Sequence, residues 1–321
     1  MAAIAGVARA GERDYAKARV SRVSVVIVSY NVRAHLERCL NVLGDGPHEV
    51  IVVDSASTDG SPEHVRTRFP RVRLIELGRN AGYGAAANVG TRAAASDYFL
   101  IMNADAWPVD AAVERLASFA DTDPEIGVAG PRLLNPDGSL QPSLRGFPTL
   151  WRLITEYLFL RWLAPRSRCF NAYYGADFDY RTTRDVESLT GAVLLLRRRA
   201  VDDVGGFDPS FFMFSEEADL CYRMRCAGWR VTFFPGAEFV HVGGASTRLD
   251  WSHMYRQQIR GHLVFFAKHH GHRRAEQARR MLVWAFRVRS LVFRGERRRL
   301  TRETGRWLAS ADVATLLERS R

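Results

Sequence analysis

Three acidic residues, Glu216, Glu217 and Asp219, are the densest group of potential acids and bases in this 321-residue sequence. They directly follow the bulky run Phe211 to Phe214, at the predicted start of a helix. Repulsion and desolvation raise the pKa of a carboxyl group in such a cluster, and a raised pKa suits a general base. The same residues could equally form a solvated first helical turn capped by Ser215.

Four polar clusters each follow a predicted strand in the first half of the chain. They are Ser29-Tyr30-Asn31, Asp54 to Gly60, Gly78 to Gly82, and Asn103-Ala104-Asp105. In an open α/β sheet, ligands bind outside the carboxyl ends of the strands, so we expect all four clusters to face one site. Asp54 either meets a donor, such as a base imide or a ribose hydroxyl, or caps the turn that ends at Gly60.

A segment of small residues follows the third cluster. Gly82, Gly84 and the run Ala85 to Ala87 would let the backbone approach a ligand closely, with Asn88 one turn into the next helix. The segment contains neither the GxGxxG fingerprint nor a P-loop. The NAD and ATP sites that are built on those motifs are therefore excluded.

Asn103 and Asp105 end the strand that is predicted to be most central. A carboxylate beside an amide can hold a hard divalent cation while a diphosphate supplies further oxygens. His241, in the late segment His241-Val242-Gly243-Gly244, could complete the coordination from the second half of the chain. The alternative for His241 is an ordinary polar residue at the end of a strand.

Short β-branched runs alternate with helical patterns up to Gly130, which predicts βαβ units with right-handed crossovers and a parallel sheet. The predicted strands are Val23 to Val28, Val50 to Val53, Val72 to Leu77, Tyr98 to Met102 and Ile126 to Ala129. The predicted helices are Arg33 to Leu43, Ser61 to Phe69, Gly84 to Ala95 and Asp110 to Ala120.

The alternation stops after Pro131, and the second half is expected to extend the same sheet. Its predicted elements are a helix at Leu150 to Leu163, a strand at Ala192 to Leu196, a helix at Glu217 to Ala227, and a strand pair at Val231 to Phe234 and Glu238 to Val242. Beyond Trp251 the pattern is helical and rich in arginine.

The composition is that of a folded protein, with 47% hydrophobic and 25% charged residues. The segment from Gly271 to Arg321 holds fourteen arginines and five acidic residues, and so accounts for nine of the eleven net positive charges. Within it, six apolar residues recur at helical spacing: Met281, Trp284, Ala285, Val288, Leu291 and Val292. Such a basic amphipathic helix can lie on anionic lipid or pack on the protein body.

Targeting and redox signals favour a cytoplasmic protein. The cysteines Cys39, Cys169, Cys221 and Cys226 form no CxxC pair or regular framework, which indicates reduced thiols. The first 20 residues lack the apolar core of a signal peptide, and no apolar run is long enough to span a membrane. Nucleic-acid binding would explain the basic tail but not the carboxylate clusters, so no nucleic acid is expected.

The order and spacing of seven segments resembles glycosyltransferase family 2, whose members are inverting enzymes of the GT-A fold. The segments, within roughly residues 22 to 250, read SYN, DSASTDGS, GRNAGYGAAAN, NAD, TGAVLLLRR, GGFDPSFFMFSEEADLCYRMRCAGW and HVGGAS. Among the branches of the family, the chain is similar to bacterial rhamnosyltransferases that extend polyprenyl-diphosphate-linked sugars. The fold class implied is α/β, with a Rossmann-like, mostly parallel sheet flanked by helices and a C-terminal helical extension.

The resemblance also implies roles for individual residues. Those implied to bind the nucleotide-sugar are Ser29, Tyr30, Asn31, Asp54, Asn80, Gly82, Asn88, Asn103 and Asp105. Asp105 and His241 would hold Mg²⁺ or Mn²⁺, and Asn103 replaces the first aspartate of the family's DxD motif. Glu217 takes the position of the catalytic base, normally an aspartate. The residues expected around the acceptor are Glu216, Asp219, Gly191 and Trp229.

The resemblance implies transfer of a sugar, with dTDP-L-rhamnose as the favoured donor, to a hydroxyl of a glycan or lipid-linked sugar during synthesis of cell-envelope polysaccharide. The alternatives are a UDP-sugar donor or an inactive nucleotide-sugar-binding protein. A sugar nucleotidyltransferase would carry a phosphate loop where this chain has Ser29-Tyr30-Asn31. A peripheral position at the inner face of the plasma membrane is expected, through the arginine-rich tail.

Four segments are expected along the chain. Residues 1–21 would be a flexible extension, and residues 22–250 a GT-A domain. That domain would divide into a nucleotide-sugar half at 22–130 and an acceptor and catalytic-base half at 131–250. Residues 251–321 would form the basic amphipathic helical tail.

Overall fold

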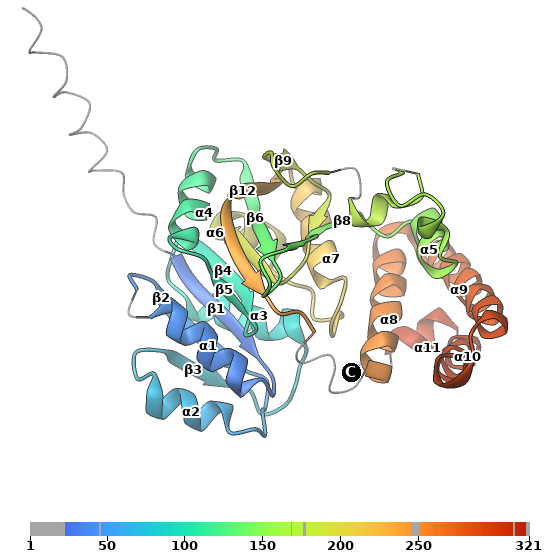
Figure 1. Cartoon of the computed structure of the whole chain (residues 1–321), viewed down its shortest axis with the longest axis horizontal. Coiled ribbons are helices and arrows are strands. Elements are labelled where there is room, and N and C mark those ends of the chain that lie inside the picture. The colour runs from blue at the N-terminus through green and yellow to red at the C-terminus, as the bar shows by residue number, and fades with distance from the viewer. Residues whose placement is uncertain are drawn as a thin grey trace, which may run out of the picture.

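The computed structural model of the protein shows one mixed β-sheet flanked by helices, with further helices gathered on one side of it (Figure 1). It describes residues 23–44, 46–167, 169–175, 178–244, 251–310 and 312–318. The expected N-terminal extension, residues 1–21, lies outside the described residues. The predicted α/β class is confirmed.

The first half of the chain forms parallel βαβ units. Strands β1 (Val23–Ser29), β2 (Glu49–Asp54), β3 (Arg73–Glu76) and β4 (Tyr98–Asn103) lie in the order β3-β2-β1-β4 with parallel pairing. The connecting helices are α1 (Arg33–Leu43), α2 (Ser61–Arg68) and α3 (Tyr83–Ala93). Each strand and helix lies within about two residues of its predicted position, because alternating β-branched residues and helical apolar spacing are local signals.

The second half extends the same sheet, as predicted. Strand β11 (Val193–Arg197) pairs antiparallel with β4 and is followed across the sheet by β6 (Ile126–Leu134), β12 (Arg230–His241) and β5 (Ala106–Pro108). The predicted strand pair at 231–242 is wrong, because both runs belong to the single strand β12. Its register shifts between Phe234 and Glu238, so Pro235 and Gly236 form a bulge and not a turn.

Helices cover both faces of the sheet. Helices α1, α2 and α4 (Ala112–Asp121) bury Leu36, Val65 and Leu116 against one face. Helices α3, α6 (Arg198–Val204) and α7 (Glu216–Cys226) cover the other face. The small residues of α3 serve this packing: Ala86 and Ala87 are fully buried, and a Cβ at Gly90 would lie 2.2 Å from the Val26 side chain.

Short elements border the second half of the sheet. Strand β7 (Leu140–Gln141) pairs with β6, and β9 (Arg184–Asp185) pairs with β12. Strands β8 (Leu144–Arg145) and β10 (Ser188–Leu189) form a separate two-stranded sheet. The short helix η3 spans Ala172–Tyr174.

The C-terminal helices form a second hydrophobic core. Helices α8 (Trp251–His270), α9 (His272–Val292), α10 (Gly295–Ala309) and α11 (Val313–Glu318) pack together with α5 (Leu150–Tyr157) and the short helix η2 (Leu160–Trp162). In α9, Leu282, Ala285 and Phe286 are buried in this core, whereas Trp284 and Leu291 are exposed. Part of the predicted amphipathic face therefore packs on the protein body. Within the described residues, no helix is both long and apolar enough to cross a membrane.

Candidate active site

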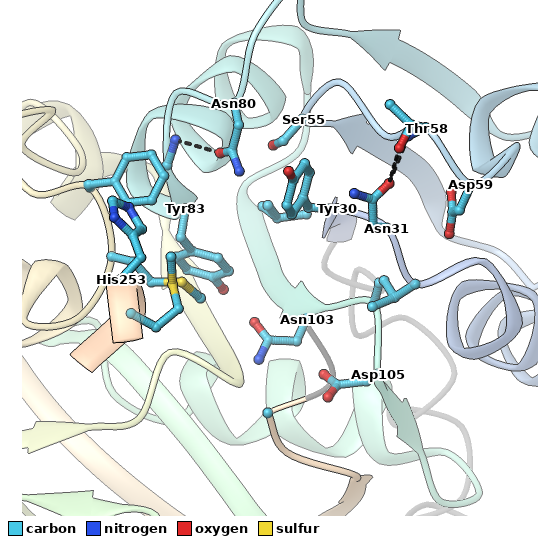
Figure 2. Close-up of a pocket in the computed structure, with 18 residues that line it drawn as sticks. Tyr30, Asn31, Ser55, Thr58, Asp59, Asn80, Tyr83, Asn103, Asp105 and His253 are labelled. Carbon is cyan, nitrogen blue, oxygen red and sulfur yellow. Dashed lines mark hydrogen bonds between the residues drawn. The ribbon is translucent and has the colours of Figure 1, made fainter. Parts of the chain in front are cut away.

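A cavity of about 640 Å³ opens at the carboxyl ends of the parallel strands (Figure 2). All four predicted polar clusters contribute to it, so the prediction that they face one site is confirmed. Its polar lining includes Tyr30, Asn31, Ser55, Thr58, Asp59, Asn80, Asn103 and Asp105. Phe212 and Met213, from the segment before α7, and His253, from α8, close it from the other half of the chain. Sequence reasoning did not identify these last three residues as lining the site.

Hydrogen bonds tie together the two loops that form one wall of this cavity. The Thr58 N–H donates to Asn31 Oδ1 at 2.7 Å, and the Asn31 N–H donates to Ser57 Oγ at 2.9 Å. Asp54 Oδ1 accepts from the Ser57 N–H at 2.8 Å, which is the turn cap that the sequence allowed. Asp54 is 1% exposed, and its Oδ2 has no protein partner among the described residues. A buried oxygen without a hydrogen-bond partner lowers the stability of the fold. Asp54 Oδ2 thus keeps one acceptor position that the described residues leave unused.

Three residues predicted to bind the nucleotide-sugar, Ser29, Asp54 and Asn88, do not line the cavity. Ser29 is fully buried within β1. The Asn88 side chain holds the backbone of Phe207 from both sides, donating to its carbonyl at 2.7 Å and accepting from its N–H at 2.9 Å. Asn88 therefore fixes α3 to the chain that leads toward α7, because its amide bonds are already satisfied there.

Gly82 and Tyr83 join the nucleotide half to the segment before α7. Gly82 has φ +88°, and a Cβ there would lie 2.1 Å from the Phe212 carbonyl oxygen. The same oxygen accepts a 2.9 Å hydrogen bond from the Tyr83 N–H. The Tyr83 hydroxyl donates to the Gly191 carbonyl at 2.6 Å. Glycine is thus required at position 82 by a backbone contact as well as by its positive φ.

Asp105 and His241 meet at the floor of the cavity. Asp105 Oδ1 lies 3.3 Å from His241 Nε2, and Asn103 Nδ2 lies 3.2 Å from the same nitrogen. Figure 2 shows Asn103 and Asp105 side by side below Tyr30. The late histidine is therefore brought to the strand-end carboxylate, although 138 residues separate it from Asn103.

Gln141 fixes the orientation of the His241 ring. Its Nε2 donates to Asn135 Oδ1 at 2.8 Å and to the His241 carbonyl at 3.0 Å, so its Oε1 must accept from His241 Nδ1–H, 2.7 Å away. The Nε2 atom is then directed toward Asn103 and Asp105. A hydrogen bond of this kind is the usual support of a metal-binding histidine. Sequence reasoning missed Gln141, because nothing near it in the chain indicates a partner 100 residues away.

The chemistry of this pair fits a divalent cation. A carboxylate oxygen and an oriented imidazole nitrogen suit Mn²⁺ well, and the carboxylate suits Mg²⁺. The described residues contain no group of three or more His, Cys, Asp or Glu that could hold a metal by itself. Asp105 and His241 would therefore share the ion with oxygens from a ligand, and a diphosphate supplies such oxygens.

Glu217 stands beside the wall formed by Tyr83 and Gly191. A Cβ built on Gly191 would lie 3.5 Å from the Tyr83 ring and 3.8 Å from Glu217 Cβ. Burial raises the pKa of Glu217, although its backbone hydrogen bonds and the Arg145 charge oppose the rise. Burial, and then the charges of Glu216, Glu217 and Asp105, likewise raise the pKa of Tyr83.

The two residues that precede Glu217, Ser215 and Glu216, are both buried. Glu216 is 4% exposed. Burial raises the pKa of its carboxyl group well above the ordinary value, and the charge of Glu217 adds to this rise. Ser215 makes no side-chain cap, because it adopts a left-handed conformation with φ +69°. The alternative of a solvated, Ser215-capped first turn is therefore wrong.

Asp219 and Trp229, both expected near the acceptor, do not reach the cavity. Asp219 is fully buried and accepts from Arg223 Nε at 2.8 Å and from His269 Nε2 at 2.7 Å, so it joins α7 to α8. Trp229 donates to Asp203 at 2.9 Å and packs on Gly127, where β6 and β12 begin. That is the opposite edge of the sheet. Gly191, in contrast, lies beside Glu217.

Comparisons with known proteins identify the family. The sequence model of the family described as "Glycosyl transferase family 2" matches residues 24–205. The N-acetylglucosaminyl-diphospho-decaprenol L-rhamnosyltransferase of Mycobacterium tuberculosis is 34% identical over 307 residues, which cover 88% of this chain and 98% of that protein.

Two solved structures share the fold. The mannosyltransferase PcManGT from Pyrobaculum calidifontis, in complex with GDP-Man and Mn²⁺, has a TM-score of 0.54 at 19% identity, covering 94% of this chain and 86% of that one. TarS 1-349 from S. aureus, in complex with UDP-GlcNAc, has a TM-score of 0.54 at 16% identity, covering 88% and 79%.

Proposed function

The chain belongs to glycosyl transferase family 2 and is a glycosyltransferase of GT-A fold, and we propose that it transfers a sugar from a nucleoside diphosphate to a hydroxyl of a polyprenyl-diphosphate-linked sugar. The carrying observation is the Asp105–His241 pair at the floor of the strand-end cavity, with Glu217 behind the adjoining wall. The acceptor class is taken from the name of the M. tuberculosis relative, which this chain matches over 88% of its length.

In the proposed reaction, the nucleotide lies along the loops after β1 and β2, and its diphosphate reaches the end of β4. Asp105 and His241 would hold a divalent cation there, and the cation would supply positive charge that offsets the charge of the departing nucleoside diphosphate. Glu217 accepts the proton of the acceptor hydroxyl as its oxygen attacks the anomeric carbon. A single displacement of this kind inverts the anomeric configuration.

Replacement of Glu217 tests this assignment. Glu217→Gln keeps the shape of the side chain but removes the base, so turnover should fall by about 100-fold or more while donor binding is kept. Glu296→Gln, the same change at an exposed position of α10, serves as a control for folding and expression. Near-normal turnover of Glu217→Gln would remove Glu217 from the role of base.

We propose dTDP-L-rhamnose as the donor, since the relative that is 34% identical is named for L-rhamnosyl transfer. A thermal-shift panel of nucleotide sugars with Mn²⁺ would identify the donor, because a ligand that binds the folded state raises its apparent stability. A UDP-sugar that stabilises the protein more than dTDP-L-rhamnose would replace this donor. An inactive binding protein, suggested by Asn103 at the DxD position, would bind the donor without transferring sugar.

We further propose that the protein works at the cytoplasmic face of the membrane, on which its arginine-rich helices rest. Trp162 and Leu163 are exposed beside η2, and Leu291 and Val292 are exposed at the end of α9. The rings of Phe159 and Phe293 lie 5.6 Å apart, so these two exposed apolar groups are neighbours. Exposed apolar residues among arginines match an anionic lipid surface.

Flotation with vesicles tests the membrane proposal. Removing the tail would expose the core around Leu282 and Phe286, so point variants are preferable. Leu291→Glu with Val292→Glu should lower the fraction bound to anionic vesicles, whereas Val42→Glu, at an exposed site on α1, should not. Equal binding of all three proteins would contradict a membrane contact at this edge.

A further inference from the structure

A second cavity, of about 350 Å³, is bordered by four arginines. They come from separate segments: Arg145 in β8, Arg152 in α5, Arg184 in β9 and Arg225 in α7. Two acidic residues, Asp185 and Glu187, share the lining. The charged residues around the cavity therefore carry a net charge of +2.

Both acidic residues form ion pairs with arginines. Glu187 accepts two hydrogen bonds from Arg152, at 2.5 and 2.8 Å. Asp185 accepts two from Arg230, at 2.9 and 3.0 Å. The lining nevertheless carries more positive than negative charge, which favours an anionic ligand.

The guanidinium groups keep donors for such a ligand. Arg225 Nη1 donates to the Val186 carbonyl at 2.7 Å, and Arg145 Nη1 donates to the Leu144 carbonyl at 2.7 Å. A guanidinium has five N–H donors, so each of these side chains can also bind phosphate oxygens. Both Arg184 and Arg225 are exposed to solvent at the cavity.

The position of this cavity relates it to the proposed base. Helix α7 begins beside the donor cavity, with Glu217 near Tyr83, and Arg225, about two turns later, borders the arginine cavity. Arg145 lies opposite Ser188 on the small sheet, three residues before Gly191. The Arg145 charge reaches Glu217 and opposes the rise in its pKa. Helix α7 thus extends from the segment that borders the donor cavity to the arginine cavity, with Glu217 in its first turn.

An apolar cleft adjoins the arginine cavity. Its volume is about 480 Å³, and it shares Arg152 and Glu187 with the arginine cavity. Phe147, Trp151 and Tyr222 contribute aromatic surface to it, and Trp151 is exposed. The arginine cavity and the apolar cleft therefore place a cationic site next to an apolar one.

We propose that the arginine cavity binds the diphosphate of the lipid-linked acceptor and that the adjoining apolar cleft holds the first isoprene units. This assignment rests on the proposed function and adds the residues that recognise the acceptor. A diphosphate with two ester bonds carries two negative charges, which matches the excess positive charge of the lining. The acceptor sugar then lies between the diphosphate and Glu217.

The test combines binding and kinetics on the full chain. The acceptors are N-acetylglucosamine linked through a diphosphate to a short isoprenyl chain, and an alkyl glycoside of the same sugar without a diphosphate. Arg184→Gln with Arg225→Gln removes two lining charges. The matched control, Arg181→Gln with Arg199→Gln, removes two exposed charges that do not border the cavity.

The double lining variant should raise the KM for the diphosphate acceptor by about 10-fold to 100-fold, the usual effect of losing bonds to a charged group. Its kcat and its KM for the alkyl glycoside should change little, and the control should behave as the wild type. Equal KM changes for both acceptors, or for both double variants, would overturn the assignment.

Direct binding of geranyl diphosphate, measured by calorimetry, tests the cavity even if no sugar transfer is detected. The wild type and the control should bind it at least 10-fold more tightly than the lining variant. Equal binding by all three proteins would exclude the diphosphate site. Absence of transfer to either acceptor, with this binding intact, would instead refute the proposed function.

Discussion

The hydrogen bond from His241 to Gln141 leads to the prediction that the structure specifies best. Gln141→Leu keeps the approximate size of the side chain but removes the Oε1 acceptor that lies 2.7 Å from His241 Nδ1. The ring then loses the contact that directs its Nε2 toward Asp105. Such supporting contacts commonly contribute about 10-fold to 100-fold to metal affinity, which corresponds to about 1.4 to 2.8 kcal/mol.

The affinity for Mn²⁺ can be followed by electron paramagnetic resonance of the free ion in the presence of a nucleoside diphosphate. Gln141→Leu should weaken binding within that range, and Asn135→Ala should weaken it less, because it removes only the anchor of Gln141 Nε2. Gln277→Leu, at an exposed position of α9, is the matched control. If Gln141→Leu binds Mn²⁺ as tightly as the control does, the orientation of His241 does not depend on this bond.

Three further predictions concern the segment around α7. Asp219→Ala should lower the free energy of unfolding by about 3 to 5 kcal/mol in urea titrations, because it removes the buried carboxylate that joins Arg223 to His269. The pKa of Asp219 is lowered in the folded state, so its contribution should disappear as the pH falls below the unfolded value of about 3.9. Gly82→Ala should reduce turnover by about 100-fold, since its Cβ would displace the Phe212 carbonyl and the chain that leads to Glu217. Unchanged turnover would mean that the backbone at Phe212 can shift without disturbing Glu217. The acid limb of kcat/KM should have its midpoint above the ordinary glutamate pKa of about 4.3, because Glu217 must be ionised and burial raises its pKa; a midpoint at or below that value would contradict a buried base.

The sequence predicted what depends on local periodicity. The bounds of α1 coincide with the predicted helix, and the four parallel strands lie close to their predicted positions. Pro235 and Gly236 misled the prediction of β12, because a proline and a glycine between apolar runs are typical of a turn. Only the pairing of β12 with β6 on one side and β5 on the other shows that the strand continues through a bulge.

Site residues were predictable where position along a strand determines them. Tyr30, Asn31 and Asp105 follow strand ends, and parallel strands bring their carboxyl ends to one edge. Asn88 and Trp229 have the residue types of a site, but their hydrogen bonds go to Phe207 and Asp203, far away in the chain. Gln141 and the arginine cavity depend on contacts between distant segments, which no local pattern contains.

The acidic cluster on α7 shows how position on a helix separates residues of one type. Successive helical residues differ in direction by about 100°, so Glu216, Glu217 and Asp219 point to different surroundings. Asp219 shares a face with Arg223 and meets His269, and these contacts outweigh the effect of burial and hold its pKa below the ordinary value.

Glu216 is nearly inaccessible, and burial and the charge of Glu217 raise the pKa of its carboxyl group well above the ordinary value. Glu217 alone combines a raised pKa with the nearby charge of Arg145 and a place beside the Tyr83 wall. Of three carboxyl groups within four positions, Asp219 has a lowered pKa and Glu216 is buried, so the partly exposed Glu217 is the one that we propose as the base.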